Sequence, residues 1–289
     1  MIHPSAYIHP SAEIGRNVRI GPNCYISEGV VLGDDCILHN NVTIGPRTRC
    51  GRANEFFPSA IIGMPPQDLK YKGGDTYVEI GDDNVFREFV TVHAGTEVAG
   101  YVTRIGSHNR FLVGVHIAHD CTIGNDCILS NQIQLAGHVV LEDRVTMGGA
   151  SAVHHFTTIG TLAFVGGCSR ITHDVPPYMI VEGNPAQVRG YNTTGMKRWG
   201  MTDEQIRAIR EAYKELFSQV AERRGKPMLG RLADLEARGD LTPEVRWLCT
   251  SIRRSLVDGV YGRALESHRR DSDEDRRAFY EGRPSVSQS

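Results

Sequence analysis

The sequence predicts an all-β coil built from hexapeptide repeats, followed by a small α-helical region. Steps of six residues from Ile2 meet an apolar side chain at almost every stop as far as Ile62. A small or short side chain lies two positions before most stops, and glycine often follows the stop. Beyond Thr202 the apolar residues change to a helical spacing, which marks the end of the coil.

The hexapeptide pattern covers most of residues 1–190. Because side chains alternate along a strand, each apolar stop and the small residue two positions before it share one face. The glycine and the polar residues between them suit tight corners. A period of six fits neither a helix nor a simple hairpin meander, so we expect short parallel strands that coil into a prism.

Two segments interrupt the repeat. Residues 63–77, GMPPQDLKYKGGDTY, lack periodic aliphatic residues and are rich in proline and glycine, so they predict a loop outside the coil. A long loop on a rigid scaffold is a common place for function. A smaller break spans about residues 95–103, after which the repeat returns at Ile105, shifted by one position, and continues to Ile171.

The region after the coil divides into three parts. DVPPYMIVEGNPAQVRG predicts an extended exit segment. An α-helical domain is expected over residues 191–268, with Thr202 as the N-cap of its first helix and short helices near 228–238 and 243–257. Residues 269–289 are charged and then serine-rich, which predicts a disordered tail.

Composition and charge narrow the function classes. Charged residues make up 23% of the chain and the net charge is −2, which gives no sign of a nucleic-acid partner. The start, MIHPSAYIHP, resembles no signal peptide, and no apolar run has the length of a membrane span. We therefore expect a cytoplasmic protein without stable membrane insertion. The seven cysteines include no CxxC pair and are expected to be reduced.

Histidines cluster in the middle of the repeat, between Val115 and Val139. If three hexapeptides make one turn of the coil, residues 18 apart stack at about the 4.8 Å spacing of parallel strands. Asp120 and His138 are stacked in this way. One position earlier, the same register aligns four residues on one edge: His119, Gly137, His155 and His173.

The residue types on this edge suit acyl transfer to a hydroxyl group. A neutral imidazole at His119 can accept the proton of a hydroxyl that attacks an acyl carbonyl. Asp120 can fix the tautomer of that imidazole and stabilise the imidazolium that forms. The backbone N–H of Gly137 can donate to the oxyanion, since no side chain blocks the approach.

Several motifs resemble a known family. HIAHDCTIGNDCIL, AGHV, AVHHF, DVPPY and the loop motif QDLKY are similar to the bacterial UDP-N-acetylglucosamine O-acyltransferases that begin lipid A synthesis, within the hexapeptide acyltransferase superfamily. The resemblance covers about residues 2–212. It implies a left-handed parallel β-helix and a homotrimer with sites between subunits. It also implies transfer of an (R)-3-hydroxyacyl chain from acyl carrier protein to the sugar 3-hydroxyl, without a cofactor or a metal.

The resemblance also implies roles for individual residues. His119 matches the catalytic base, Asp120 its partner and Gly137 the oxyanion donor. Gly167 matches the end of the acyl-chain ruler, where glycine leaves room for a longer chain. Lys70 is expected to reach across the subunit interface. The implied substrate contacts are Gln67, Asp68, Lys70, His116, His138, His154, His155, Asn192 and Arg198.

The chain departs from the family pattern at three positions. His155 stands where the family commonly has glutamine. Thr194 and Trp199 stand where acidic and basic contacts to the nucleotide are frequent, so the way uridine is held stays open. Trp199 offers stacking on a base as one alternative. His93 and His108 are expected to be surface residues, and the preferred acyl-chain length is not determined by the sequence.

Three other functions stay open from sequence alone. A metalloenzyme of the carbonic anhydrase type uses the same β-helix, with histidines from neighbouring subunits around zinc. A non-enzymatic scaffold would have no use for His119. An acyltransferase acting on a 3-amino sugar would share most of the site with the O-acyltransferase.

Overall fold

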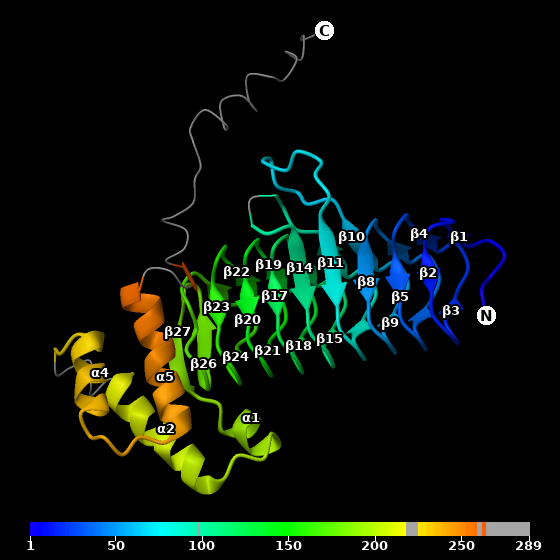
Figure 1. Ribbon diagram of the computed structural model, residues 1–289. Coiled ribbons are helices and arrows are strands. Elements are labelled where there is room, and N and C mark those ends of the chain that lie inside the picture. Colours follow the sequence, from blue (N-terminus) through cyan, green and yellow to red (C-terminus); the bar gives the residue numbers. More distant parts are fainter. Residues whose placement is uncertain (98, 218–224, 259–261, 264–289) are drawn as a thin grey trace.

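The computed structural model describes residues 1–97, 99–217, 225–258 and 262–263, and Figure 1 shows their arrangement. A long prism of short strands carries a cluster of helices at its C-terminal end. The tail predicted for residues 269–289 lies outside the described residues. No described helix has both the length and the apolar character to cross a membrane.

The prism is a left-handed parallel β-helix with three sheets. The nine-stranded sheet contains β1 (Tyr7–Ile8), β4 (Tyr25–Ile26), β7 (Thr43–Ile44), β10 (Ile61–Met64), β13 (Thr91–His93), β16 (His116–Ile117), β19 (Gln134–Leu135), β22 (Ala152–Val153) and β25 (Arg170–Ile171). The eight-stranded sheet contains β2 (Glu13–Ile14), β5 (Val31–Leu32), β8 (Thr48–Cys50), β11 (Tyr77–Ile80), β14 (Val102–Ile105), β17 (Thr122–Ile123), β20 (Val140–Leu141) and β23 (Thr158–Ile159).

The ten-stranded sheet completes the prism and continues into a hairpin. It contains β3 (Arg19–Ile20), β6 (Ile37–Leu38), β9 (Glu55–Phe56), β12 (Val85–Phe86), β15 (Arg110–Phe111), β18 (Ile128–Leu129), β21 (Thr146–Met147), β24 (Phe164–Val165), β26 (Met179–Gly183) and β27 (Ala186–Tyr191). All pairs within the prism are parallel, as the six-residue period predicts.

The core of the prism is formed by the apolar stops of the repeat. Phe56, Phe86 and Phe111 are fully buried on successive coils, with ring centroids 4.9 and 5.0 Å apart. Strand partners are 18 residues apart through most of the prism, for example His116 and Gln134. The stacking of residues one coil apart, which the sequence predicts, is therefore confirmed.

Buried asparagines form a ladder beside the apolar core. Asn54, Asn84 and Asn109 are fully buried at equivalent corners. The Asn84 side chain donates to Asn54 Oδ1 at 2.9 Å and to the Gly106 carbonyl at 3.0 Å, and its Oδ1 accepts from the Asn109 backbone at 2.9 Å. Each coil is thus hydrogen-bonded to the next inside the prism.

We expect Asn84→Ala to lower the free energy of unfolding by about 1–3 kcal/mol, because buried partners of the amide lose their hydrogen bonds. Chemical denaturation measures the loss. Asn131→Ala is the matched control, since Asn131 is exposed and surface changes usually cost less than about 0.5 kcal/mol. Equal stability losses in the two variants would contradict a supporting role for the ladder.

Both interruptions of the repeat leave the prism at one edge. Residues 63–77 connect β10 to β11, and residues 94–101 connect β13 to β14, so both cross from the nine-stranded to the eight-stranded sheet. Figure 1 shows the two loops rising side by side from the prism. The Glu97 carboxylate accepts a hydrogen bond from the Gly74 backbone at 2.7 Å, which ties the second loop to the first.

The C-terminal region begins with a hairpin and continues as helices. The predicted extended exit segment is β26 paired antiparallel with β27. The helices are α1 (Thr193–Arg198), α2 (Asp203–Leu216), α4 (Met228–Glu236) and α5 (Pro243–Arg253), and a π-helical turn follows at Arg254–Asp258. Thr202 caps α2 together with Gln205 in a capping box. A second apolar core, which includes Leu162 and Met196, joins these helices to the end of the prism.

Candidate active site

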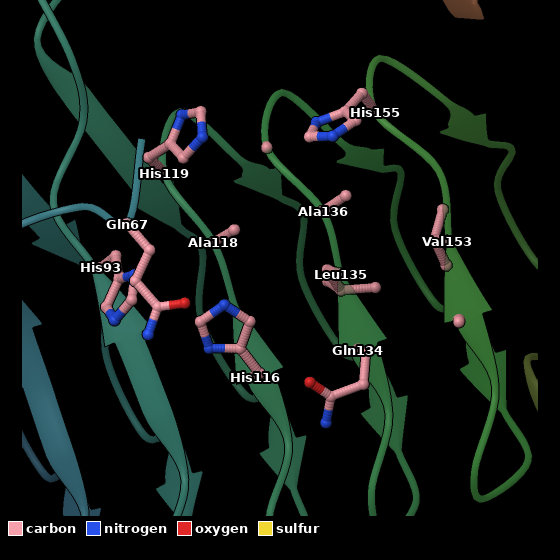
Figure 2. A pocket seen from close by; sticks show the side chains of 12 residues that line it. Gln67, His93, His116, Ala118, His119, Gln134, Leu135, Ala136, Val153 and His155 are labelled. Carbon is pink, nitrogen blue, oxygen red and sulfur yellow. The ribbon is translucent and has the colours of Figure 1, made fainter. Parts of the chain in front are cut away.

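A pocket of about 340 Å³ lies on the prism edge below the two loops. This histidine edge consists of the corners at residues 118–121, 136–139 and 154–157, which connect the nine-stranded to the eight-stranded sheet. Figure 2 shows the side chains around the pocket. Its lining is Gln67, His93, His116, Ala118, His119, Gln134, Leu135, Ala136, Gly137, Ala152, Val153 and His155.

His119 and Asp120 form a hydrogen-bonded pair at the first of these corners. Asp120 adopts the left-handed backbone conformation with φ of 60°, which short polar residues such as aspartate tolerate best. Its Oδ2 lies 2.8 Å from His119 Nδ1, and its side chain is only 2% exposed. The carboxylate therefore accepts the Nδ1–H of His119 and leaves Nε2 as the atom that can accept a proton.

The loop of residues 63–77 reaches this pair within the same chain. Asp68 Oδ2 lies 3.8 Å from His119 Nε2, and Gln67 lines the pocket. Asp68 Oδ1 accepts a hydrogen bond from the Lys70 backbone at 3.0 Å, which fixes the turn of the loop. Gln67 thus lines the pocket of its own chain, and Asp68 lies beside His119 of its own chain.

Gly137 lies one coil beyond His119, directly against the imidazole ring. A Cβ atom at residue 137 would be 2.4 Å from His119 Cε1 and 2.6 Å from Nε2. Its backbone N–H donates to no partner in the part of the chain that the structure describes. Glycine therefore makes room for the ring and leaves a free donor beside His119 Nε2.

We expect Gly137→Ala to displace the His119 ring, because the added methyl group would overlap with it. A reaction that depends on this imidazole should then show a kcat about 100-fold lower, the order of cost of a small misplacement. Steady-state kinetics measure the loss. Gly190→Ala is the control, since a Cβ atom there meets nothing within 4 Å. Full activity of Gly137→Ala would show that the ring position in the structure is not the active one.

The other histidines near the pocket are held neutral by burial. His138 stacks on Phe156 with ring centroids 4.3 Å apart, and its Nε2 is 3.9 Å from Asp120 Oδ2. Burial lowers the pKa of His138 to about 4, which outweighs the opposite effect of the nearby Asp120 carboxylate. His116 is hydrogen-bonded through Nδ1 to Thr91 Oγ1 at 2.7 Å, and burial lowers its pKa as well.

The expectation that His93 is a surface residue is wrong. Its side chain is buried in the pocket lining, 4.8 Å from the His116 ring, and its Nδ1 has no hydrogen-bond partner among the described residues. Burial lowers the pKa of His93 to about 4. His93 ends strand β13, directly before the second interruption of the repeat. That position in the sequence was the signal that could have predicted its burial.

His154 and His155 lie at the third corner of the histidine edge. His155 lines the pocket, and its ring centroid is 5.4 Å from that of His154. The Nδ1 of His154 is buried and has no hydrogen-bond partner in the described part of the chain. Burial, with a contribution from the positive charge of Arg263, lowers the pKa of His154.

The remaining predicted residues do not line this pocket. The Asn192 side chain caps helix α1, accepting from the Gly195 backbone at 2.9 Å and donating to the Leu162 carbonyl at 2.8 Å. Arg198 lies in the last turn of α1. Trp199, considered as a platform for a base, stacks instead on the Arg144 guanidinium at 4.5 Å. At Gly167 a Cβ atom would make ordinary contact, 3.4 Å from the Gly149 carbonyl.

Three side chains at or beside the pocket have the ligand types that metal ions use. Among the described residues one triad, His119, Asp120 and His138, brings its ligand atoms within 4.8 Å of one another. Zinc requires bonds of about 2.0–2.1 Å to deprotonated ligands. The shortest contact in the triad is the hydrogen bond between His119 Nδ1 and Asp120, so an ion there would have to displace that proton.

Comparisons with known proteins agree with the fold. Residues 1–28 and 11–46 match the bacterial transferase hexapeptide repeat, and residues 174–260 match the second domain of the UDP-N-acetylglucosamine O-acyltransferases. A curated acyl-[acyl-carrier-protein]–UDP-N-acetylglucosamine O-acyltransferase from a Synechocystis strain is 46% identical over 193 residues, which are 66% of this chain and 69% of the relative.

Solved structures extend the similarity to most of the chain. LpxA from Acinetobacter baumannii is 41% identical with a TM-score of 0.83, over 88% of this chain and 97% of that protein. LpxA from Bacteroides fragilis, a UDP-N-acetylglucosamine acyltransferase, is 38% identical with a TM-score of 0.84, over 89% and 98%. The coil and its histidine edge thus define an acyltransferase of the hexapeptide-repeat superfamily. Within it, the chain belongs to the UDP-N-acetylglucosamine O-acyltransferase family.

Proposed function

We propose that the protein transfers an (R)-3-hydroxyacyl chain from acyl carrier protein to the 3-hydroxyl of UDP-N-acetylglucosamine, the first step of lipid A biosynthesis. The observation that carries the proposal is the His119–Asp120 pair, which directs Nε2 into a pocket beside the backbone N–H of Gly137. The Synechocystis relative, an acyl-[acyl-carrier-protein]–UDP-N-acetylglucosamine O-acyltransferase, supports this donor and acceptor. The Bacteroides fragilis relative, a UDP-N-acetylglucosamine acyltransferase, supports the acceptor.

The reaction follows from the positions of these three residues. His119 Nε2 takes the proton of the sugar hydroxyl as its oxygen attacks the thioester carbonyl. Asp120 stabilises the imidazolium, and the Gly137 N–H donates to the developing oxyanion. When the tetrahedral intermediate collapses, the C–S bond breaks and the imidazolium returns its proton to the carrier thiolate. The carrier supplies the acyl group, so the proposal requires no cofactor.

The substrate contacts are assigned to the groups around this centre. Gln67, Asp68 and His116 face the pocket or its mouth and can contact the sugar, while His138 and His155 extend the histidine edge. The proposal retains Lys70 and His154 as substrate contacts. It assigns Gly167 to the end of the acyl channel and Asn192 and Arg198 to the nucleotide or the carrier, at a distance from the pocket of their own chain.

We also propose that the cytoplasmic, active form is a homotrimer. Three apolar side chains, Tyr7, Tyr25 and Ile61, project from the outer face of the nine-stranded sheet and are 38–48% exposed. Exposed apolar side chains along one face are typical of an interface. The separation of Asn192 and Arg198 from the pocket of their own chain is explained if a neighbouring subunit brings them closer. Light scattering of the purified protein measures the assembly.

Product analysis tests the reaction. The purified protein is incubated with UDP-N-acetylglucosamine and a series of 3-hydroxyacyl carrier proteins, and mass spectrometry identifies the acylated sugar nucleotide. We expect O-acylated product, with the series giving the preferred chain length. No product with any donor would refute the proposal. A 3-amino analogue of the acceptor distinguishes an N-acyltransferase, and metal analysis of the same sample tests the carbonic anhydrase alternative.

A further inference from the structure

The Asp120 carboxylate is held by one residue outside the histidine edge, Thr96. The Thr96 backbone N–H donates to Asp120 Oδ1 at 2.8 Å, and the Thr96 hydroxyl donates to Asp120 Oδ2 at 2.7 Å. Oδ2 is the oxygen that also accepts from His119 Nδ1. Thr96 therefore donates a hydrogen bond to each oxygen of the carboxylate, and Oδ2 accepts a further hydrogen bond from the imidazole.

Thr96 belongs to the second interruption of the repeat. Residues 94–101 replace the ordinary corner one coil before Asp120. At an ordinary corner the left-handed residue donates its backbone N–H to a carbonyl of the preceding coil, as His138 does to His119 at 3.0 Å. The backbone N–H of Asp120 donates instead to the Thr103 hydroxyl at 2.8 Å. The inserted segment, through Thr96, and the strand that follows it, through Thr103, thus both form hydrogen bonds with Asp120.

The inserted segment is built to keep Thr96 in place. Gly95 lets its two ends meet, because a Cβ atom there would be 2.3 Å from the backbone nitrogen of Val102. The Thr96 carbonyl accepts from the Tyr101 backbone at 3.0 Å, and the next residue, Glu97, is bonded to the loop of residues 63–77. Thr96 is fully buried, so water does not compete for its hydroxyl.

We propose that Thr96 is a positioning residue for acyl transfer, which fixes the Asp120 carboxylate in the orientation that holds His119 for proton transfer. This inference rests on the proposed function of His119 as the general base. It gives the second interruption a role in the reaction, although none of the residues that the structure describes in it lines the pocket. Thr96 acts through Asp120 alone, and it has no contact with the substrate.

Kinetics of Thr96→Val test the inference. Valine keeps the shape and the backbone N–H but removes the hydroxyl donor, so we expect kcat to fall about 10-fold, the order of one hydrogen bond to a charged group, with little change in KM for the sugar nucleotide. Thr96→Ser retains the donor and should restore most of the activity. Thr122→Val makes the same change at an exposed residue of strand β17 and should have no effect on kcat.

A double-mutant cycle separates positioning from general loop stability. In an Asp120→Ala background the hydroxyl of Thr96 has no carboxylate to hold, so adding Thr96→Val should cause no further loss of kcat. A further loss equal to that in the wild-type background would overturn the inference, as would full activity of the single variant. Full activity of His119→Ala would refute the proposed role of His119 as general base, and the positioning role of Thr96 would be refuted with it.

Discussion

The His119→Ala variant should lose acyl transfer by about 10²- to 10⁴-fold in kcat, the usual contribution of a positioned general base. The His119 side chain is 10% exposed, its Nδ1 is hydrogen-bonded to Asp120, and the residue lines the pocket. Because His93 and His138 have pKa values of about 4, both are neutral at pH 7. Among the described residues, neither has a carboxylate at hydrogen-bond distance to support an imidazolium.

The assay for this variant is the rate of product formation at saturating concentrations of both substrates. His3→Ala is the matched control, since His3 is an exposed histidine in the first coil. The loss should appear in kcat and not in binding of the sugar nucleotide. An unimpaired His119→Ala enzyme would show that the proton leaves by another route, and it would favour a scaffold role for the histidine edge.

The Asp120→Asn variant should be impaired by up to about 10⁴-fold in kcat, as when an amide replaces the carboxylate behind a catalytic histidine. Thr96 determines which way round the side-chain amide of the new asparagine lies. Its backbone N–H must meet an acceptor, so the Asn oxygen takes the place of Oδ1 and the NH₂ group faces His119 Nδ1. That arrangement favours the tautomer with hydrogen on Nε2, which cannot accept the proton of the substrate.

A second substitution checks the explanation. Asp120→Ala removes the wrong donor as well as the acceptor, and should therefore be less impaired than Asp120→Asn. Thermal unfolding of both variants controls for damage to the fold. A higher activity of Asp120→Asn than of Asp120→Ala would contradict the explanation. It would show that the carboxylate acts through its charge or by supporting the structure, and not by fixing the tautomer of His119.

The fold was predictable because one pattern repeats along most of the coil. The spacing of Ile117, Ile123 and Leu129 determines the strands, their parallel pairing and the stacking of His119 on Gly137. The interior is filled by those same side chains, so local sequence and tertiary packing agree. The hairpin of β26 and β27 was predicted only as extended chain, because its pairing depends on contacts with β24 and with the helices.

The site was predictable only where it follows the repeat. His119, Asp120 and Gly137 occupy consecutive corners, and their positions follow from the 18-residue register. His93 and Thr96 belong to the boundary of an irregular segment, where burial is decided by how two loops fold over each other. The side chain of Asn192 is engaged in capping α1, a local interaction that a resemblance between families does not reveal.

The register also bears on how such a chain can change length during evolution. Strand partners are 18 residues apart in ordinary coils, 30 where the first loop enters and 25 where the second enters. Gain or loss of a complete turn in the coils before Ile61 would lengthen or shorten the prism without moving a catalytic atom. The number of N-terminal coils can therefore vary in whole turns of 18 residues, whereas a deletion within a strand would break the 18-residue pairing of that strand with its neighbours.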